Sequence, residues 1–350
     1  MSNFHQILTE IIEKIEIDEN FTVAHPDYEA LELAPDVIEK LHQALPQIRS
    51  KYLTTQVQEY LYDIYFSHSS ISVQELEIAE QQPVQLTNNI VNGIDIHFYE
   101  QLRQSNTGEG YLDSNWQVVA ETEDRELVVV KDGLHLHLDR QRYLDPDLAH
   151  VTIGSTIPIY LPPSLVGEDT YIIVGNAGVP KVYPPNGAEK SLELYFNFTP
   201  DAALKIAAQL THELNRLKIP FRFAILHDPV LFYRYDAGTL RLDQAGYLAI
   251  QPVLAQLHQA HQAEFSPNVP LFSKQLAPGL GLAEVPTAPS NFGMQRCELV
   301  AKGLIAAMEQ DRTAATAKFE LIQQQWTIAG LDLLQPYLNP LRSDCYNFAF

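Results

Sequence analysis

The sequence predicts an α+β protein, with an N-terminal helical subdomain followed by a mostly antiparallel sheet flanked by helices. Apolar residues recur at helical spacing through about the first 80 of the 350 residues. From about residue 90, short β-branched and alternating segments appear, and amphipathic helical segments return between and after them. We therefore expect a helical subdomain at 1–90 and an α+β domain at 91–350.

The N-terminal helices are expected where the apolar spacing is regular. The three stripes cover 4–15, 37–45 and 52–65, and the second ends at Pro46. The aromatic residues of the third stripe indicate packing rather than a cofactor site. A Glu- and Gln-rich run at 74–86 is expected to connect the two parts of the chain.

The second part alternates between strand and helix signals. Strands are expected at 116–120, 126–130, 134–138, 157–161, 171–175, 192–198, 221–226 and 240–242. Helices are expected at 96–102, 200–217, 247–263, 290–308 and 313–329. Thr199 can cap the helix that begins at Pro200.

The bulk composition limits the classes of partner. The chain is 46% hydrophobic and has a net charge of -21, from 44 acidic and 23 basic residues. An acidic surface argues against nucleic acid or an anionic membrane as the main partner, and it suits a polar or cationic peptide. The same charge is also explained by solubility alone.

Metal sites and targeting segments are not indicated. The two cysteines, Cys297 and Cys345, are far apart and lack metal-ligand spacing, so we expect neither a disulfide framework nor a zinc site. The N-terminus has no basic start followed by an apolar run, and no window resembles a membrane helix. These features lead us to expect a cytoplasmic protein without a signal peptide. The glycines at 105–110 are too loosely spaced to predict a phosphate loop.

A predicted hairpin at 128–138 contains a lysine and two histidines. Asp132-Gly133 is a typical turn between the two strands. A two-residue turn would pair Lys131 with Leu134 and place His135 and His137 on the other face. A three-residue loop would instead pair Lys131 with His135 and bring all three polar groups together. The sequence leaves both registers open.

Four cations lie in aromatic or Gly- and Pro-rich segments of the second half, namely Arg222, Arg234, Lys274 and Arg296. In an acidic protein, such cations could form an anion pocket, because arginine suits bidentate phosphate contacts. The alternative is that they form salt bridges, as Arg234 could with Asp236 or Glu284.

The same segments resemble the HopA1 family, which is named for a type III secretion effector. The matching segments are 98–102, 105–111, the hairpin around 131–134, 195–200, 220–223, 234–237, 274–284 and 290–297. The resemblance covers about 95–310 and is most specific at 274–297.

The resemblance implies a lyase that acts after a kinase-like partner on a ribosomally made precursor peptide. Such an enzyme eliminates phosphate from phosphoserine or phosphothreonine and leaves dehydroalanine or dehydrobutyrine, as in lanthipeptide biosynthesis. Elimination needs a base, an acid and cations, but neither a metal nor an organic cofactor.

We nominate Lys131 as the base, His137 as the acid with His135 as its alternate, and Arg222, Arg234, Lys274 and Arg296 as the phosphate-binding residues. If the two-residue turn holds, Lys274 is the next candidate base. The chain departs from the family pattern at Ala224, where many relatives carry a lysine. The alternative function is a non-catalytic HopA1-like module, or effector-like interaction protein, that binds a peptide or protein.

Overall fold

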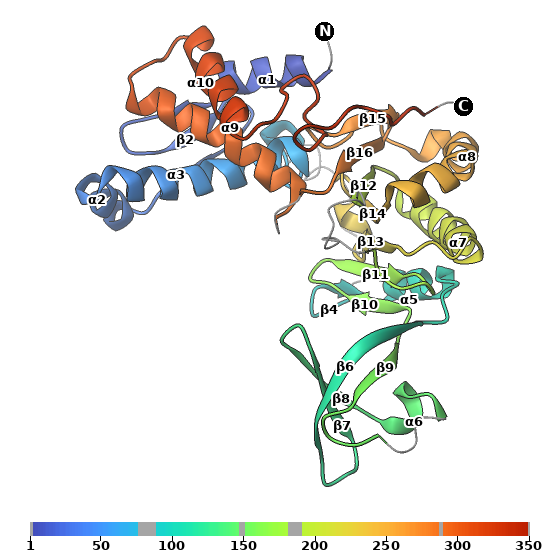
Figure 1. Cartoon of the computed structure of the whole chain (residues 1–350). Helices are drawn as coiled ribbons and strands as arrows, with labels where there is room; N and C mark the ends of the chain where they lie inside the picture. The colour runs from blue at the N-terminus through green and yellow to red at the C-terminus, as the bar shows by residue number, and fades with distance from the viewer. Residues whose placement is uncertain (1–2, 76–88, 147–150, 181–190, 287–289, 349–350) are drawn as a thin grey trace.

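The computed structural model describes residues 3–75, 89–146, 151–180, 191–286 and 290–348. Figure 1 shows a helical part, a central sheet with helices on one side, and a smaller sheet that projects away from both. The described residues form four sheets, and the neighbouring strands in each sheet are antiparallel. The predicted α+β class, with helices first and an antiparallel sheet after them, is therefore confirmed.

The helical part begins the chain as predicted, with one addition. Its helices are α1 (Asn3–Lys14), α2 (Pro35–Gln43), α3 (Pro46–Leu61) and the π-helix η1 (Tyr62–Phe66). Between α1 and α2 lies a small sheet of β1 (Glu16–Ile17), β2 (Val23–His25) and β3 (Tyr28–Leu31). These strands are too short to produce a clear alternating pattern, so the sequence did not predict them.

The end of the chain returns to the helical part. The helices α9 (Phe292–Glu309) and α10 (Ala315–Ile328) share one hydrophobic core with α1 and α3. Gly303 of α9 permits the close approach of α10, because a Cβ at that position would lie 2.6 Å from the Ile322 Cα. The division into domains at residue 90 stays a prediction.

The projecting sheet has the strand order β8-β7-β6-β9. Its strands are β6 (Tyr111–Glu121), β7 (Leu127–Lys131), β8 (Leu134–Leu138) and β9 (Thr156–Leu161), with the short helix α6 (Arg140–Tyr143) after β8. The sheet has a core of its own, which includes Trp116, Val129 and Ile159. The segment before it forms β4 (Ile90–Val91), β5 (Ile94–Asp95) and α5 (Ile96–Ser105).

The central sheet has seven strands in the order β10-β11-β13-β14-β12-β16-β15. They are β10 (Ser164–Val166), β11 (Thr170–Val174), β12 (Ser191–Phe196), β13 (Arg222–Leu226), β14 (Gly238–Asp243), β15 (Lys274–Ala277) and β16 (Leu280–Glu284). The helices α7 (Pro200–Arg216) and α8 (Gln244–Ala260) cover one face (Figure 1). The short 3-10 helices η3 (Pro229–Leu231) and η4 (Gln262–Glu264) lie in the connections. Thr199 caps α7 as predicted.

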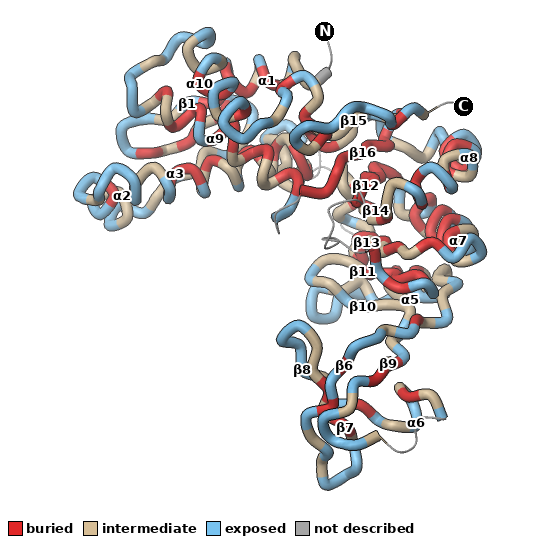
Figure 2. Tube along the Cα trace, viewed as in Figure 1, coloured by how far each residue is buried: buried red, intermediate tan, exposed pale blue. Residues whose placement is uncertain are grey.

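The two faces of the central sheet differ in chemistry. The face toward α7 and α8 is apolar and supplies Leu194, Phe223 and Leu240 to the largest core cluster. Alternation along each strand turns Glu193, Arg222, Ala224, Thr239 and Arg241 to the other side, which we call the open face. Figure 2 shows β12 buried along its length, whereas Arg222, Ala224, Thr239 and Arg241 are only half-buried.

Candidate functional site

The hairpin at 127–138 has the two-residue turn. The β7 and β8 strands pair with Lys131 opposite Leu134, so Asp132 and Gly133 alone connect them. Both turn residues have positive φ, 50° for Asp132 and 82° for Gly133. A type I′ turn requires this conformation at both positions. The structure therefore selects the first of the two registers that the sequence left open.

This register separates the nominated base from the nominated acids. Lys131 donates to both carboxylate oxygens of Asp113 at 2.7 and 2.8 Å, and its Nζ lies 5.8 Å from the centroid of the Trp116 ring. His135 and His137 are exposed on the opposite face of β8. The hairpin thus does not assemble one site from these three residues, and their catalytic roles stay predictions.

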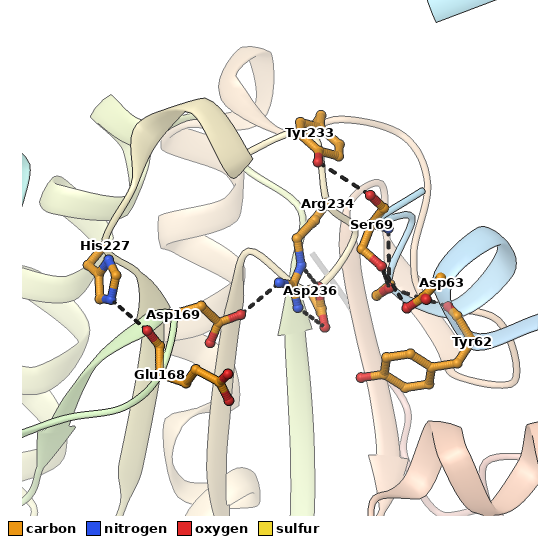
Figure 3. A network of polar contacts seen from close by, with 10 residues as sticks. Tyr62, Asp63, Ser69, Glu168, Asp169, His227, Tyr233, Arg234 and Asp236 are labelled. Atoms are coloured by element: carbon orange, nitrogen blue, oxygen red, sulfur yellow. Dashed lines mark hydrogen bonds and ion pairs between the residues drawn. The ribbon is translucent and has the colours of Figure 1, made fainter. Parts of the chain in front are cut away.

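Arg234 lies between the carboxylates of Asp169 and Asp236 (Figure 3). Its Nη1 donates to Asp169 at 2.7 Å, and its Nε and Nη2 donate to Asp236 at 2.9 and 3.1 Å. The salt bridge to Asp236 that the sequence offered as an alternative is therefore present. Every nitrogen of Arg234 donates to a carboxylate, so this guanidinium ties the loop before β11 to the segment before β14.

Lys274 and Arg296 both hold the C-terminal segment. Lys274 Nζ donates to Asp344 at 2.5 Å and to the Tyr346 carbonyl at 2.6 Å. Arg296 is fully buried and donates to the carbonyls of Pro336 and Leu338 at 2.8 and 3.0 Å. Burial lowers the pKa of Arg296 to about 10. A phosphate could reach Arg296 only after its contacts opened, and Lys274, although partly exposed, is already paired with the Asp344 carboxylate. Their phosphate-binding roles stay predictions, as does the fallback of Lys274 as the base.

Two other guanidinium groups do lie together, on the open face. Arg222 in β13 is opposite Arg241 in β14, and Arg241 is opposite Glu193 in β12. Arg241 Nε donates to Glu193 at 3.0 Å. Within the described residues, the Arg222 guanidinium has no hydrogen-bond or ion-pair partner. We refer to Glu193, Arg222 and Arg241 as the arginine pair site.

The electrostatics of the arginine pair site favour an anion. Burial and the neighbouring charge of Arg241 lower the pKa of Arg222, while Glu193 opposes this shift. Tyr195 donates to Glu193 at 2.9 Å, and burial together with that carboxylate raises the pKa of Tyr195 well above its usual value. Together, Arg222, Arg241 and Glu193 carry a charge of about +1, and Tyr195 adds none because it stays neutral.

Ala224 also lies on this face. It is two residues beyond Arg222 on β13 and is opposite both Ile172 and Thr239. A side chain at residue 224 projects to the same side as Arg222. The position where the family resemblance leads us to expect a lysine is therefore adjacent to the arginine pair site.

Sequence reasoning identified one member of the arginine pair site and missed two. Arg241 lies between Leu240 and Leu242, as Arg222 lies between Phe221 and Phe223, so the same signal was available for both arginines. Glu193 lies between Leu192 and Leu194 in the same way. What the sequence could not show is that these three strands are neighbours, because their order in the sheet does not follow their order in the chain.

Comparison with known proteins relates the chain to one family. The model of the HopA1 effector protein family matches residues 161–338. Two solved structures are similar to this one: the effector proteins from Pseudomonas syringae pv. tomato strain DC3000 and from Pseudomonas syringae pv. syringae strain 61. Each is 15% identical with a TM-score of 0.42; the first match covers 84% of this chain and 97% of the other, the second 85% and 100%. No curated protein matches the chain.

Proposed function

Because the chain belongs to the HopA1 effector protein family, we propose that its central sheet recognises a phosphorylated peptide, with the phosphate bound between Arg222 and Arg241. The observation that carries this proposal is the juxtaposition of two guanidinium groups on a half-buried face, with the carboxylate of Glu193 beside Arg241 and no side-chain partner for Arg222 among the described residues. The proposed partners are a phosphorylated precursor peptide and the kinase-like protein that phosphorylates it.

Like charges placed directly opposite each other on neighbouring strands destabilise a sheet. A bound dianion would reverse that effect, because the Arg222 guanidinium can donate two parallel hydrogen bonds to phosphate oxygens. Arg241, whose Nε and Nη2 contact Glu193, would add its positive charge beside them. The chain as a whole is strongly acidic, with a net charge of -21. A phosphate would therefore be drawn to this one face rather than to the surface in general.

Elimination of that phosphate, as in the lyases that the family resemblance implies, is the second candidate function. The arginine pair favours it, because leaving phosphate carries charge that two guanidinium groups would stabilise. In the reaction, a base removes the Cα proton, the electron pair forms the Cα–Cβ double bond, and the Cβ–O bond breaks with release of phosphate. The nominated Lys131, His135 and His137 belong to the projecting sheet rather than to this face. Ala224 occupies the adjacent position on this face.

The test uses one phosphothreonine peptide and its unphosphorylated form. Isothermal titration calorimetry should show binding of the phosphorylated peptide that is at least about tenfold tighter, as expected for charge-assisted contacts to phosphate. Equal affinity for the two peptides would contradict phosphate recognition.

Mass spectrometry of the same mixtures decides between the two functions. Loss of phosphoric acid from the peptide would show elimination, whereas an unchanged phosphopeptide, bound by folded protein, would limit the chain to recognition. The Ala224→Lys variant adds a lysine next to the arginine pair. Elimination by this variant but not by the natural chain would show that the missing amine is what separates the two functions.

A further inference from the structure

A cavity lies between the helical part and the loops at the ends of the central strands. The cavity has a volume of about 850 Å³, and three carboxylates line it, those of Glu10, Asp27 and Glu75. Tyr28, Tyr233 and Tyr235 contribute aromatic surface. None of the described residues that line the cavity is a lysine or an arginine. This chemistry is opposite to that of the arginine pair site.

The carboxylates are only partly neutralised by their surroundings. Lys14 Nζ contacts both Glu10 and Asp27, at 3.0 and 2.7 Å. Glu75 accepts hydrogen bonds from the backbone N–H and hydroxyl of Ser72, and it lies 3.4 Å from the His68 ring nitrogen. Three carboxylates and one ammonium group give a charge of about −2 when His68 is neutral.

A buried acceptor at the same cavity is unpaired. Asn197 lines the cavity and is 2% exposed. Its Nδ2 donates to the Asn268 carbonyl at 3.0 Å, which fixes the orientation of the amide because a carbonyl can only accept. Its Oδ1 has no hydrogen-bond partner among the described residues. Since a buried acceptor without a partner costs free energy, this oxygen is suited to a ligand that donates.

The aromatic residues of the cavity are also suited to a cationic ligand. The ring of His68 stacks on Tyr235, with centroids 4.6 Å apart and planes 7° from parallel. Burial and the nearby Tyr235, Glu75, Glu10 and Asp27 raise the pKa of Tyr28 to about 12. The three carboxylates that line the cavity give it a negative potential, which attracts a cation. Tyrosine faces bind cations as well.

From these observations we propose that the cavity binds the cationic side chain of a peptide, an arginine guanidinium or a lysine ammonium. Asn197 Oδ1 and the Glu75 carboxylate accept its N–H groups, and the tyrosine rings flank its apolar stem. The ligand belongs to the class of basic peptides. The proposal is independent of phosphate recognition, because it uses different residues and the opposite charge.

The probe is an acetylated and amidated Gly-Gly-Arg-Gly-Gly peptide, and its matched control carries citrulline in place of arginine. Calorimetric titration of the full chain should show binding of the arginine peptide and about tenfold weaker binding of the citrulline peptide, which has the same shape without the charge. Equal affinities, or no measurable binding of the arginine peptide, would overturn the proposal.

Two variants place the binding at this cavity. Glu75→Gln alters an exposed carboxylate, and Asn197→Leu removes the unpaired acceptor. Each should weaken arginine-peptide binding by about tenfold. Glu123→Gln removes one exposed charge from the projecting sheet and should leave the affinity unchanged. If Asn197→Leu fails to fold, Glu75→Gln still decides, and equal loss in Glu75→Gln and Glu123→Gln would show that only the overall acidity attracts the peptide.

Discussion

Arg222 lies directly opposite Arg241 across the β13–β14 pair, and Arg241 in turn donates a hydrogen bond to Glu193 on β12. The Arg222 guanidinium has no partner among the described residues, so a purely structural ion pair of Arg241 with Glu193 does not account for it. The excess charge is therefore the feature from which binding of an anion follows.

Replacing Arg222 by Gln should separate binding from stability. Phosphopeptide affinity should fall by about tenfold or more, since a charge-assisted contact to phosphate is lost. The free energy of unfolding should be unchanged or higher by about 0.5 kcal/mol, because repulsion from Arg241 is relieved. Calorimetric titration and urea unfolding measure the two quantities.

The control for that variant is Arg216→Gln, which removes an exposed arginine paired with Glu213 at the end of α7. This variant should leave both the phosphopeptide affinity and the free energy of unfolding nearly unchanged. A loss of phosphopeptide affinity equal to that of Arg222→Gln would mean that net charge, rather than the arginine pair site, governs binding.

Arg234 has the opposite role and should be required for stability. Its side chain is 17% exposed, and that of Asp236 is 9% exposed. Arg234→Met would leave Asp236 buried without its partner, so unfolding should become easier by about 3 kcal/mol. Asp169→Asn, at a carboxylate that is 43% exposed, should cost much less.

The stability lost in Arg234→Met should depend on pH, and the pKa of Asp236 gives the direction. Burial raises the pKa of Asp236 above its usual value even though Arg234 opposes the shift. Removing Arg234 should raise this pKa further. A carboxyl whose pKa is raised in the folded state contributes stability at low pH and loses it as pH rises through the folded pKa. The deficit of Arg234→Met relative to the natural chain should therefore be smaller at about pH 4.5 than at pH 7. An equal deficit at both values would contradict this account.

The two cysteines should differ strongly in reactivity. Cys297 is fully buried in the core shared by α9 and the N-terminal helices, and burial raises its pKa well above the usual range. Cys345 is exposed. A thiol reagent should therefore modify one cysteine in the native protein, and the second only as the protein unfolds. Cys345→Ser should abolish the fast phase, and a fast phase that persists in this variant would show that the shared core opens readily.

Local pattern was sufficient for most elements of the fold. The hydrophobic spacing predicted α1, α3, α7 and α9, because each buries one stripe of side chains. It did not predict the hairpin of β15 and β16, because Gly279 and Gly281 resemble a loop when their strand partners are unknown.

The candidate site was harder to predict, because a binding face depends on contacts between distant strands. The sequence identified Arg222 but grouped it with Arg234, Lys274 and Arg296, which the fold directs to carboxylates and carbonyls. Burial and pairing are properties of the folded chain, so the residue types alone could not distinguish an unpaired arginine from a paired one.

The hairpin residues provide a last test of the sequence-based assignment. Lys131 lies between Asp113 and the Trp116 ring at the end of the projecting sheet. Lys131→Ala should lower the free energy of unfolding by about 1 kcal/mol, from the loss of a half-buried ion pair and a cation–π contact. It should leave phosphopeptide affinity unchanged, because the arginine pair site belongs to another sheet.

His135→Ala and His137→Ala, at exposed positions, should change neither the free energy of unfolding nor the phosphopeptide affinity. If the natural chain releases phosphate and Lys131→Ala abolishes that release without unfolding, Lys131 would be restored as the base, and the reacting peptide would have to reach the projecting sheet.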